Sequence, residues 1–521
     1  MNIGKHASKI SFAIFGSRIL GLIRDQIFAA LIGAGFLADA YVIAFRIPNL
    51  LRDLFAEGSL TNAFVPTLTQ VKENQSDQAA WELVRITLAW VLLLVGTLTL
   101  LGIFFAPQIV QWIAPGFVDV AGKLALTAKL ARIMFPFLVI VSIASVLMGI
   151  HNVEGRFALP ALAPMAFNLV SIAFGLLIWL LGSDGQSSVI LWSVGTLCGG
   201  LGQCLIQLPP LLRKGDLFWP KFRGMFSHPQ IRGMGMLMLP SVIAVSGTQV
   251  NVLVNSILAS LLQQGAPSWL NYAFRLMQLP LGVFGVAISM VTLASVSKDV
   301  AQKNPEKVVE TLSSSIILTL LLTLPCSFGL WVLGKPILAL IYQRGAFSSS
   351  DTLATSLALH MYALGLPMYA LVKVVAPVFF SLGQAKKPMA ASLTGIALNI
   401  GFNLWAYQKL GHSGLALGTS LGMSLNFLML MSFLPKQNIK LPYKKIFRAL
   451  LTITVSSVIM AGLCLYLYKT LEQSMGRSLG HRLIYTLLPV SMGAAIYFAL
   501  LWILALPEAR LLIQKIKEKI G

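Results

Sequence analysis

Residues 17–66 decide the fold, and they read SRILGLIRDQIFAALIGAGFLADAYVIAFRIPNLLRDLFAEGSLTNAFVP. The stretch has the length and apolar content of two membrane-spanning helices. It also carries charged side chains, which are Arg18, Arg24, Asp25, Asp39, Arg46, Arg52, Asp53 and Glu57. A charge facing lipid at the centre of a span costs roughly 2.5–3.5 kcal/mol, so we expect both helices to line a polar cavity.

The spacing of these charges is helical. Asp39, Arg46 and Asp53 recur every seven residues, and Glu57 follows Asp53 by four, so all four share one stripe. Guanidinium groups match phosphate oxygens in two-point geometry, and interspersed acids neutralise the site when it is empty. The pattern favours a polyanion site. The alternative is a set of buried ion pairs that only hold the helices together.

The composition excludes an ordinary soluble domain. Of 521 residues, 57% are hydrophobic and 11% are charged, whereas soluble domains are about 25% charged. About fourteen apolar stretches are long enough to span a bilayer. The chain is therefore predicted to be an all-α polytopic membrane protein. The first apolar segment contains Arg18 and Arg24 and lacks a small-residue cleavage site, so we expect it to stay as a helix.

The net charge of +21 follows the positive-inside rule. With the N-terminus inside, most of the lysines and arginines fall in loops on that one side, which is atypical of a nucleic-acid surface. This predicts a multi-pass protein of a bacterial inner (plasma) membrane with cytoplasmic N- and C-termini and no nucleic-acid partner. The basic loops should also attract anionic lipid headgroups.

An internal duplication is visible. Residues 44–47 (AFRI) return as 273–276 (AFRL), and the turn at 155–160 matches the turn at 383–388, at nearly the same offset. We therefore expect two pseudo-symmetric six-helix lobes and two further C-terminal spans, with a substrate site between the lobes. The predicted parts are an N-terminal lobe at 1–220, a basic cytoplasmic linker at 221–232, a C-terminal lobe at 233–440, and an extension with a basic tail at 441–521.

Polar residues in the second lobe extend the hypothesis. Asn271, Arg275 and Gln278 share one helical stripe, so Arg275 is predicted to face the same cavity; the alternative is an arginine that snorkels to the interface. The amides of Asn399 and Asn403 either bond neighbouring helices or coordinate a cation or sugar. The last two spans carry no intramembrane charge, so they bind a hydrophobic tail along a groove or simply pack.

Enzyme chemistry is not indicated. The sequence has no GxxxxGK[ST] loop, no HExxH motif, no paired-cysteine motif and no Asp-rich diphosphate motif at a helix end. The four cysteines lie in apolar spans without metal-ligand spacing. A transporter without metal or cofactor is therefore expected.

Four motifs carry a family resemblance. SRILGLIRDQ at 17–26, DAYVIAFRIPNLLRDLFAEGSLTNAFVP at 39–66, APGF at 114–117 and YAFRLMQLP at 272–280 resemble the MurJ/MviN proteins. These are lipid II flippases of peptidoglycan synthesis and cell-wall biogenesis, in the multidrug/oligosaccharidyl-lipid/polysaccharide exporter superfamily. The resemblance covers nearly the whole chain.

The resemblance implies alternating access that moves lipid II, the undecaprenyl-diphosphate-linked disaccharide pentapeptide, to the periplasmic leaflet. It implies membrane lipids, and cell-wall synthesis or division proteins, as partners. The alternative is export of other polyprenyl-linked glycans or of drugs. The substrate-binding residues that it implies are Arg18, Arg24, Arg52, Arg275, Asp39, Ser17, Asp25, Asn49 and Glu57. Within this set, Arg24, Arg52 and Arg275 are assigned to the diphosphate, and Arg18 and Asp39 to gating or charge balance.

Two positions depart from the family pattern. Some members have acids in the eighth span where this chain has Phe274 and Gln278, and a family sodium site uses an acid in the eleventh span where this chain has Asn399 and Asn403. Sodium coupling is therefore not expected, and membrane potential and proton coupling stay open as alternatives.

Overall fold

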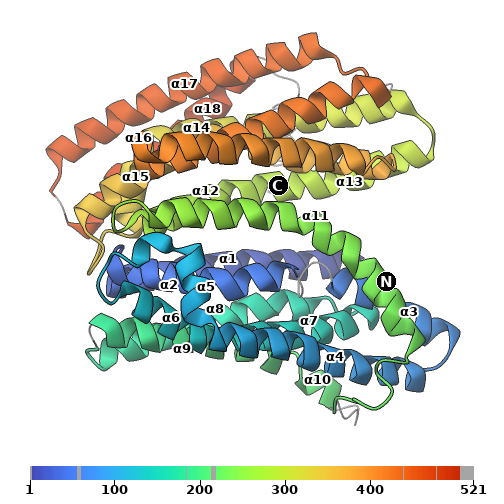
Figure 1. Ribbon diagram of the computed structural model, residues 1–521. Coiled ribbons are helices and arrows are strands. Elements are labelled where there is room, and N and C mark those ends of the chain that lie inside the picture. The colour runs from blue at the N-terminus through green and yellow to red at the C-terminus, as the bar shows by residue number, and fades with distance from the viewer. Residues whose placement is uncertain are drawn as a thin grey trace. The chain divides into compact units, whose positions relative to one another are not determined.

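The computed structural model describes residues 3–54, 60–183, 185–212, 219–437, 439–476, 478–504 and 508, with the backbone alone at 3–15, 240–241, 243–244 and 479. Every regular element in these residues is a helix (Figure 1). The chain forms two compact units. Unit 1 comprises residues 1–268 and 344–347, and unit 2 comprises 269–343 and 348–521.

Unit 1 is a bundle of helices of different lengths. Its helices are α1 (Ile3–Ile32), α2 (Phe36–Arg52), α3 (Thr61–Asn74), α4 (Asp77–Phe104), α5 (Ala106–Ile113), α6 (Lys123–Met134), α7 (Phe137–Val153), α8 (Ala158–Leu180), α9 (Gly185–Leu205), α10 (Pro209–Leu212) and α11 (Pro229–Ser260). α1 packs on α8, and α8 on α9; α2 packs on α6, and α7 on α3 and α4. An apolar core joins α3, α4 and α7.

Unit 2 is centred on α14 and α15. Its helices are α12 (Ala266–Pro280, of which the first turn belongs to unit 1), a π-helical turn (Leu281–Gly285), α13 (Val286–Ala301), α14 (Pro305–Ile341), α15 (Ser349–Ser381), α16 (Lys386–Phe433), α17 (Tyr443–Ser474) and α18 (Leu479–Ile503). α15 packs between α14 and α16, and α17 and α18 pack on α14. The core of this unit lies among α14, α15, α16 and α17.

Local signals in the sequence set the helix boundaries. Ser348 caps α15 by accepting a hydrogen bond from the backbone N–H of Asp351, whose carboxylate accepts from the Ser348 backbone in return, a capping box. Ser76 caps α4 through the Ala79 N–H at 3.1 Å. Gly411 interrupts α16 with φ 58° and ψ −143°, a conformation that excludes most side chains. The kink therefore divides α16 into two helices.

The membrane-protein prediction is confirmed. Among the described residues, ten helical segments are long and apolar enough to cross a bilayer, and one of them is the kinked segment Lys386–Gln437. α1, α2 and α11 are further helices of unit 1. Counted with the two parts of α16, these helices agree with about fourteen predicted spans.

The two turns that suggested a duplication have the same geometry. At the end of α7, Gly155 adopts φ 73° and the Arg156 N–H bonds the His151 carbonyl at 2.8 Å. At the end of α15, Gly383 adopts φ 69° and the Gln384 N–H bonds the Phe379 carbonyl at 2.8 Å. Both turns are left-handed helix caps of one type. α8 ends in the same way, with Gly182 at φ 59° and the Ser183 N–H on the Ile178 carbonyl at 3.2 Å. The repeat and the lobe limits therefore stay predictions; by contacts, α11 groups with unit 1.

Candidate functional site

The first arginine of the candidate site is paired within its own helix. Arg24 donates from Nε and Nη2 to Oδ1 of Asp25, at 3.1 and 2.8 Å. Both side chains are 14% exposed, and the guanidinium lies over the Phe167 ring of α8 at 5.4 Å. α1 therefore presents a nearly neutral ion pair, with the cation held against an aromatic face.

The second arginine repeats this arrangement at the end of α2. Arg52 donates from Nε and Nη2 to Oδ1 of Asp53, at 3.2 and 2.9 Å. The pair is more open, at 23% and 32% exposure. The other carboxylate oxygen of Asp53 accepts a hydrogen bond from Gln249 of α11 at 3.3 Å. Gln249, a polar residue in an apolar span, thus orients the acid of the pair.

Three further predicted residues of unit 1 lie on α1 and α2 themselves. Arg18 is half-buried, and it makes no hydrogen bond or ion pair with another described residue. The Ser17 carbonyl accepts from Nδ2 of Asn168 at 3.0 Å, which ties α1 to α8. Asn49 is half-buried in the last turn of α2. Glu57 lies outside the described residues.

Arg275 belongs to unit 2, where it is half-buried in α12. Asn271 is also half-buried and Gln278 is exposed, so this polar stripe is not closed inside the unit. Pro280 ends α12, and a π-helical turn at 281–285 follows it. Proline and a π-helical segment both interrupt the regular i→i−4 hydrogen bonds of the α-helix, and here they do so just beyond Arg275.

Asp39 is fully buried in unit 1. Its carboxylate accepts hydrogen bonds from Nζ of Lys123 at 2.9 Å, from the Gly265 N–H at 2.8 Å, and from the N–H and hydroxyl of Ser268 at 3.1 and 2.6 Å. Lys123 is 2% exposed and lies 4.2 Å from the centroid of the Phe117 ring. This cluster joins α2, α6 and the first turn of α12 through one carboxylate.

Lys123 is absent from the sequence-based hypothesis. It stands at the first residue of a span, where lysine is ordinarily a solvated flank. Its partner is 84 residues earlier in the chain, and helical spacing identifies the faces of one helix only. The sequence indicates only that a buried carboxylate such as that of Asp39 requires a cationic partner. It does not indicate which lysine or arginine that partner is.

The two asparagines of the eleventh span bond each other. Nδ2 of Asn403 donates to Oδ1 of Asn399 at 2.7 Å, and both residues are buried. Asn399 and Asn403 also lie against Gly422 and Gly418 of the following helix segment. The hydrogen bond lies within one helix, and the contact with the neighbouring segment is made by packing against its two glycines. This packing favours the helix-packing alternative, while a hydrogen bond to a neighbouring helix stays a prediction. In the part of the chain that the structure describes, no group of three His, Cys, Asp or Glu side chains is placed to hold a metal ion.

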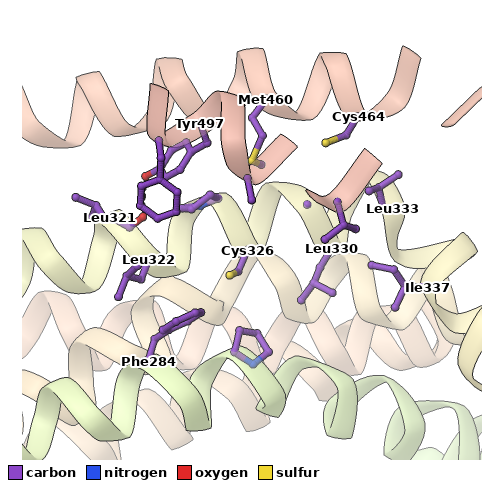
Figure 2. Close-up of a pocket in the computed structure, with 16 residues that line it drawn as sticks. Phe284, Leu321, Leu322, Cys326, Leu330, Leu333, Ile337, Met460, Cys464 and Tyr497 are labelled. Carbon is purple, nitrogen blue, oxygen red and sulfur yellow. Dashed lines mark hydrogen bonds between the residues drawn. The ribbon is translucent and has the colours of Figure 1, made fainter. Parts of the chain in front are cut away.

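Unit 2 contains an apolar cavity of about 350 Å³ among the π-helical turn, α14, α17 and α18. Figure 2 shows Phe284 and Cys326 on one side of it, with Met460, Cys464 and Tyr497 from the last two helices on the other. The Tyr497 hydroxyl donates to the Leu321 carbonyl at 2.7 Å, so the polar atom of this ring is satisfied within the wall. The cavity suits a hydrocarbon chain.

The helical fold and its long apolar helices define a class, the polytopic all-α membrane proteins. A solved MATE family transporter of the MOP superfamily in an inward-facing conformation matches with a TM-score of 0.67, over 81% of this chain and 94% of its own, at 17% identity. This likeness shows the fold.

The chain itself belongs to the lipid II flippase MurJ family, whose model matches residues 28–485. The Lipid II flippase MurJ of Burkholderia cenocepacia is 31% identical over 98% of this chain and 99% of its own. The Probable lipid II flippase MurJ of Vibrio cholerae is 33% identical over 94% and 93%. A solved Lipid II flippase MurJ in an inward closed conformation has a TM-score of 0.79 and 28% identity, over 95% and 98%. The predicted family is confirmed, and it is a family of transporters.

Proposed function

We propose that this chain moves lipid II from the cytoplasmic to the periplasmic leaflet of a bacterial inner membrane by alternating access, with both termini cytoplasmic. The family membership supports the lipid-linked substrate. The observation that carries the site is the repeated pairing of an intramembrane arginine with the aspartate that follows it, at Arg24–Asp25 and at Arg52–Asp53.

These pairs suit a diphosphate that binds and leaves. An arginine beside a carboxylate stays charged in the membrane, because the attraction within the almost neutral pair offsets part of the cost of removing both groups from water. A diphosphate offers more oxygens in the same two-point geometry and more negative charge, so it competes with the aspartate for the guanidinium. After release, the aspartate returns to the arginine. We assign Arg24, Arg52 and Arg275 to the diphosphate.

The other predicted residues have supporting roles in this proposal. Arg18 shares α1 with Arg24 and adds positive charge near the diphosphate. Ser17, Asn49, Asp25 and Glu57 complete the polar surface. Asp39 acts from inside the protein: its four hydrogen bonds within unit 1 support the gating and charge-balance role.

The cavity of unit 2 supplies a place for the hydrocarbon part of the substrate. Its lining is apolar, and it involves both of the last two helices, α17 and α18. A polyprenyl tail has no polar atom to satisfy there, and its burial is favoured by roughly 25 cal/mol per Å² of apolar surface. We therefore favour tail binding over simple packing for these helices.

The experiment is leaflet exposure of lipid II in cells depleted of their own flippase and complemented by this chain. Wild type is expected to expose lipid II, and Arg24→Ala to expose none at equal expression. Arg24→Ala/Asp25→Asn keeps the net charge of the pair. It is also expected to expose no lipid II, because the diphosphate loses the two-point contact with the guanidinium group. Lys445→Ala, which removes an exposed lysine paired with Glu508 at 2.8 Å, is the matched control.

Exposure at the wild-type level from both Arg24 variants would overturn the site. Equal exposure with and without wild-type protein would overturn the substrate and leave export of drugs or of other polyprenyl-linked glycans. The tail is tested separately by Gly329→Leu, because a Cβ at Gly329 meets no heavy atom within 4 Å inside the cavity. Gly462→Leu, equally open but outside the lining, is its control.

A further inference from the structure

Unit 1 contains a second cavity, of about 490 Å³, among α4, α7, the start of α11 and the segment before α11. Trp90 and Leu94 of α4, Met238 of α11 and Phe226 of the preceding segment are among its apolar walls. Arg232, in the first turn of α11, is the one ionisable side chain that lines it among the described residues. The volume lies in the range of ordinary ligand pockets.

The segment before α11 is fixed on α4. The Lys221 N–H bonds the Arg85 carbonyl at 3.0 Å, and Nε of Arg85 donates to the Trp219 carbonyl at 3.0 Å. Nε1 of Trp90 donates to the carbonyl of Met225, also at 3.0 Å, and the Met225 side chain is buried. The segment is thus held on α4 at three points, and it forms one wall of the cavity.

The same segment marks a membrane interface. Trp219, Phe222 and Phe226 are 69%, 52% and 74% exposed, and they alternate with the basic residues Lys221 and Arg223. Exposed aromatic rings beside lysine and arginine are typical of the headgroup level on the cytoplasmic face. The mouth of the cavity therefore lies at that level. From Thr87 to Val95 its α4 wall runs about 12 Å deeper, at 1.5 Å per residue.

We propose that this cavity binds one acyl chain of an anionic phospholipid, with the headgroup phosphate on Arg232. Arg232 is exposed, and no described carboxylate pairs with it, so its charge is available to an anion. Arg223 of the docked segment adds to the positive potential there, whereas Lys221 is paired with Glu82. The deeper walls are apolar. The phospholipid is a bound structural ligand that is separate from the transported substrate.

The test is lipid titration of the purified protein in detergent, read by native mass spectrometry with phosphatidylglycerol and phosphatidylcholine. Wild type is expected to bind phosphatidylglycerol about tenfold more tightly. Arg232→Gln should abolish this preference. Gly235→Leu should weaken the binding of both lipids at least tenfold, because a Cβ at this lining glycine meets no heavy atom within 4 Å and the added side chain takes up space that the acyl chain needs.

Gly233→Leu is the matched control, since its Cβ is equally unobstructed but the residue is not part of the lining; it should bind as wild type does. Thermal unfolding without added lipid checks that each variant is folded, and if Gly235→Leu is not, the decision rests on Arg232→Gln. Equal affinity of wild type for the two lipids would overturn the proposal. So would unchanged binding by folded Gly235→Leu, or displacement of phosphatidylglycerol by undecaprenyl diphosphate, which would assign the cavity to the substrate path.

Discussion

Replacing Lys123 by methionine tests the buried cluster around Asp39. The side chains are similar in length, so the change removes the ammonium group with little change in packing. The Asp39 carboxylate is completely buried and keeps three donors, from Gly265 and Ser268. Breaking a buried ion pair by removing one partner costs about 3–5 kcal/mol, because the other charge is left uncompensated. We expect the free energy of unfolding to fall by about this amount.

The assay is reversible unfolding of the purified protein in mixed micelles, with the double variant Lys123→Met/Asp39→Asn completing a mutant cycle. The amide that replaces the carboxylate carries no charge, so the double variant should recover at least about 2 kcal/mol relative to the sum of the single losses. Lys129→Met is the control, since Lys129 is exposed on the same helix. A Lys123→Met protein as stable as wild type would refute the account of this cluster.

Three further predictions concern other contacts. Arg52→Lys keeps the charge but loses the two-point contact that Arg52 makes with Asp53, so lipid II exposure at equal expression should fall at least about tenfold. Gly345→Ala places a Cβ against the Ala30 carbonyl at φ 55°, and it should lower the free energy of unfolding by about 1–3 kcal/mol in the same micelle assay. Ser348→Ala removes a capping hydroxyl and should cost about 1 kcal/mol, again by unfolding.

Much of the fold could be predicted because a bilayer imposes simple rules. Apolar length predicts the spans, whereas the orientation drawn from loop charge stays a prediction. The turn at Gly155 and its counterpart at Gly383 share sequence because both end a helix with a left-handed residue. The sequence also predicts separate spans at 388–409 and 412–434, and the kink at Gly411 lies between them.

The candidate site was predicted less completely, because periodicity describes one helix at a time. It grouped Asp39 and Asp53 on one stripe, but Asp53 pairs with the adjacent Arg52, while Asp39 binds Lys123 from another helix. Partners distant in sequence follow from tertiary packing. The two cavities also depend on packing, since a void is the space left among several helices and no single segment encodes it.

The adjacent Arg–Asp pairs also matter before the protein is folded. Two separate charges at the centre of a span would each add roughly 2.5–3.5 kcal/mol to the cost of entering the bilayer from the translocon. Arg24 and Asp25 meet within a single helix, so the first span can neutralise itself as it is inserted and needs no other helix for this. The nascent chain can therefore bring the paired arginines of the candidate site into the membrane one helix at a time, before the helical bundle is assembled.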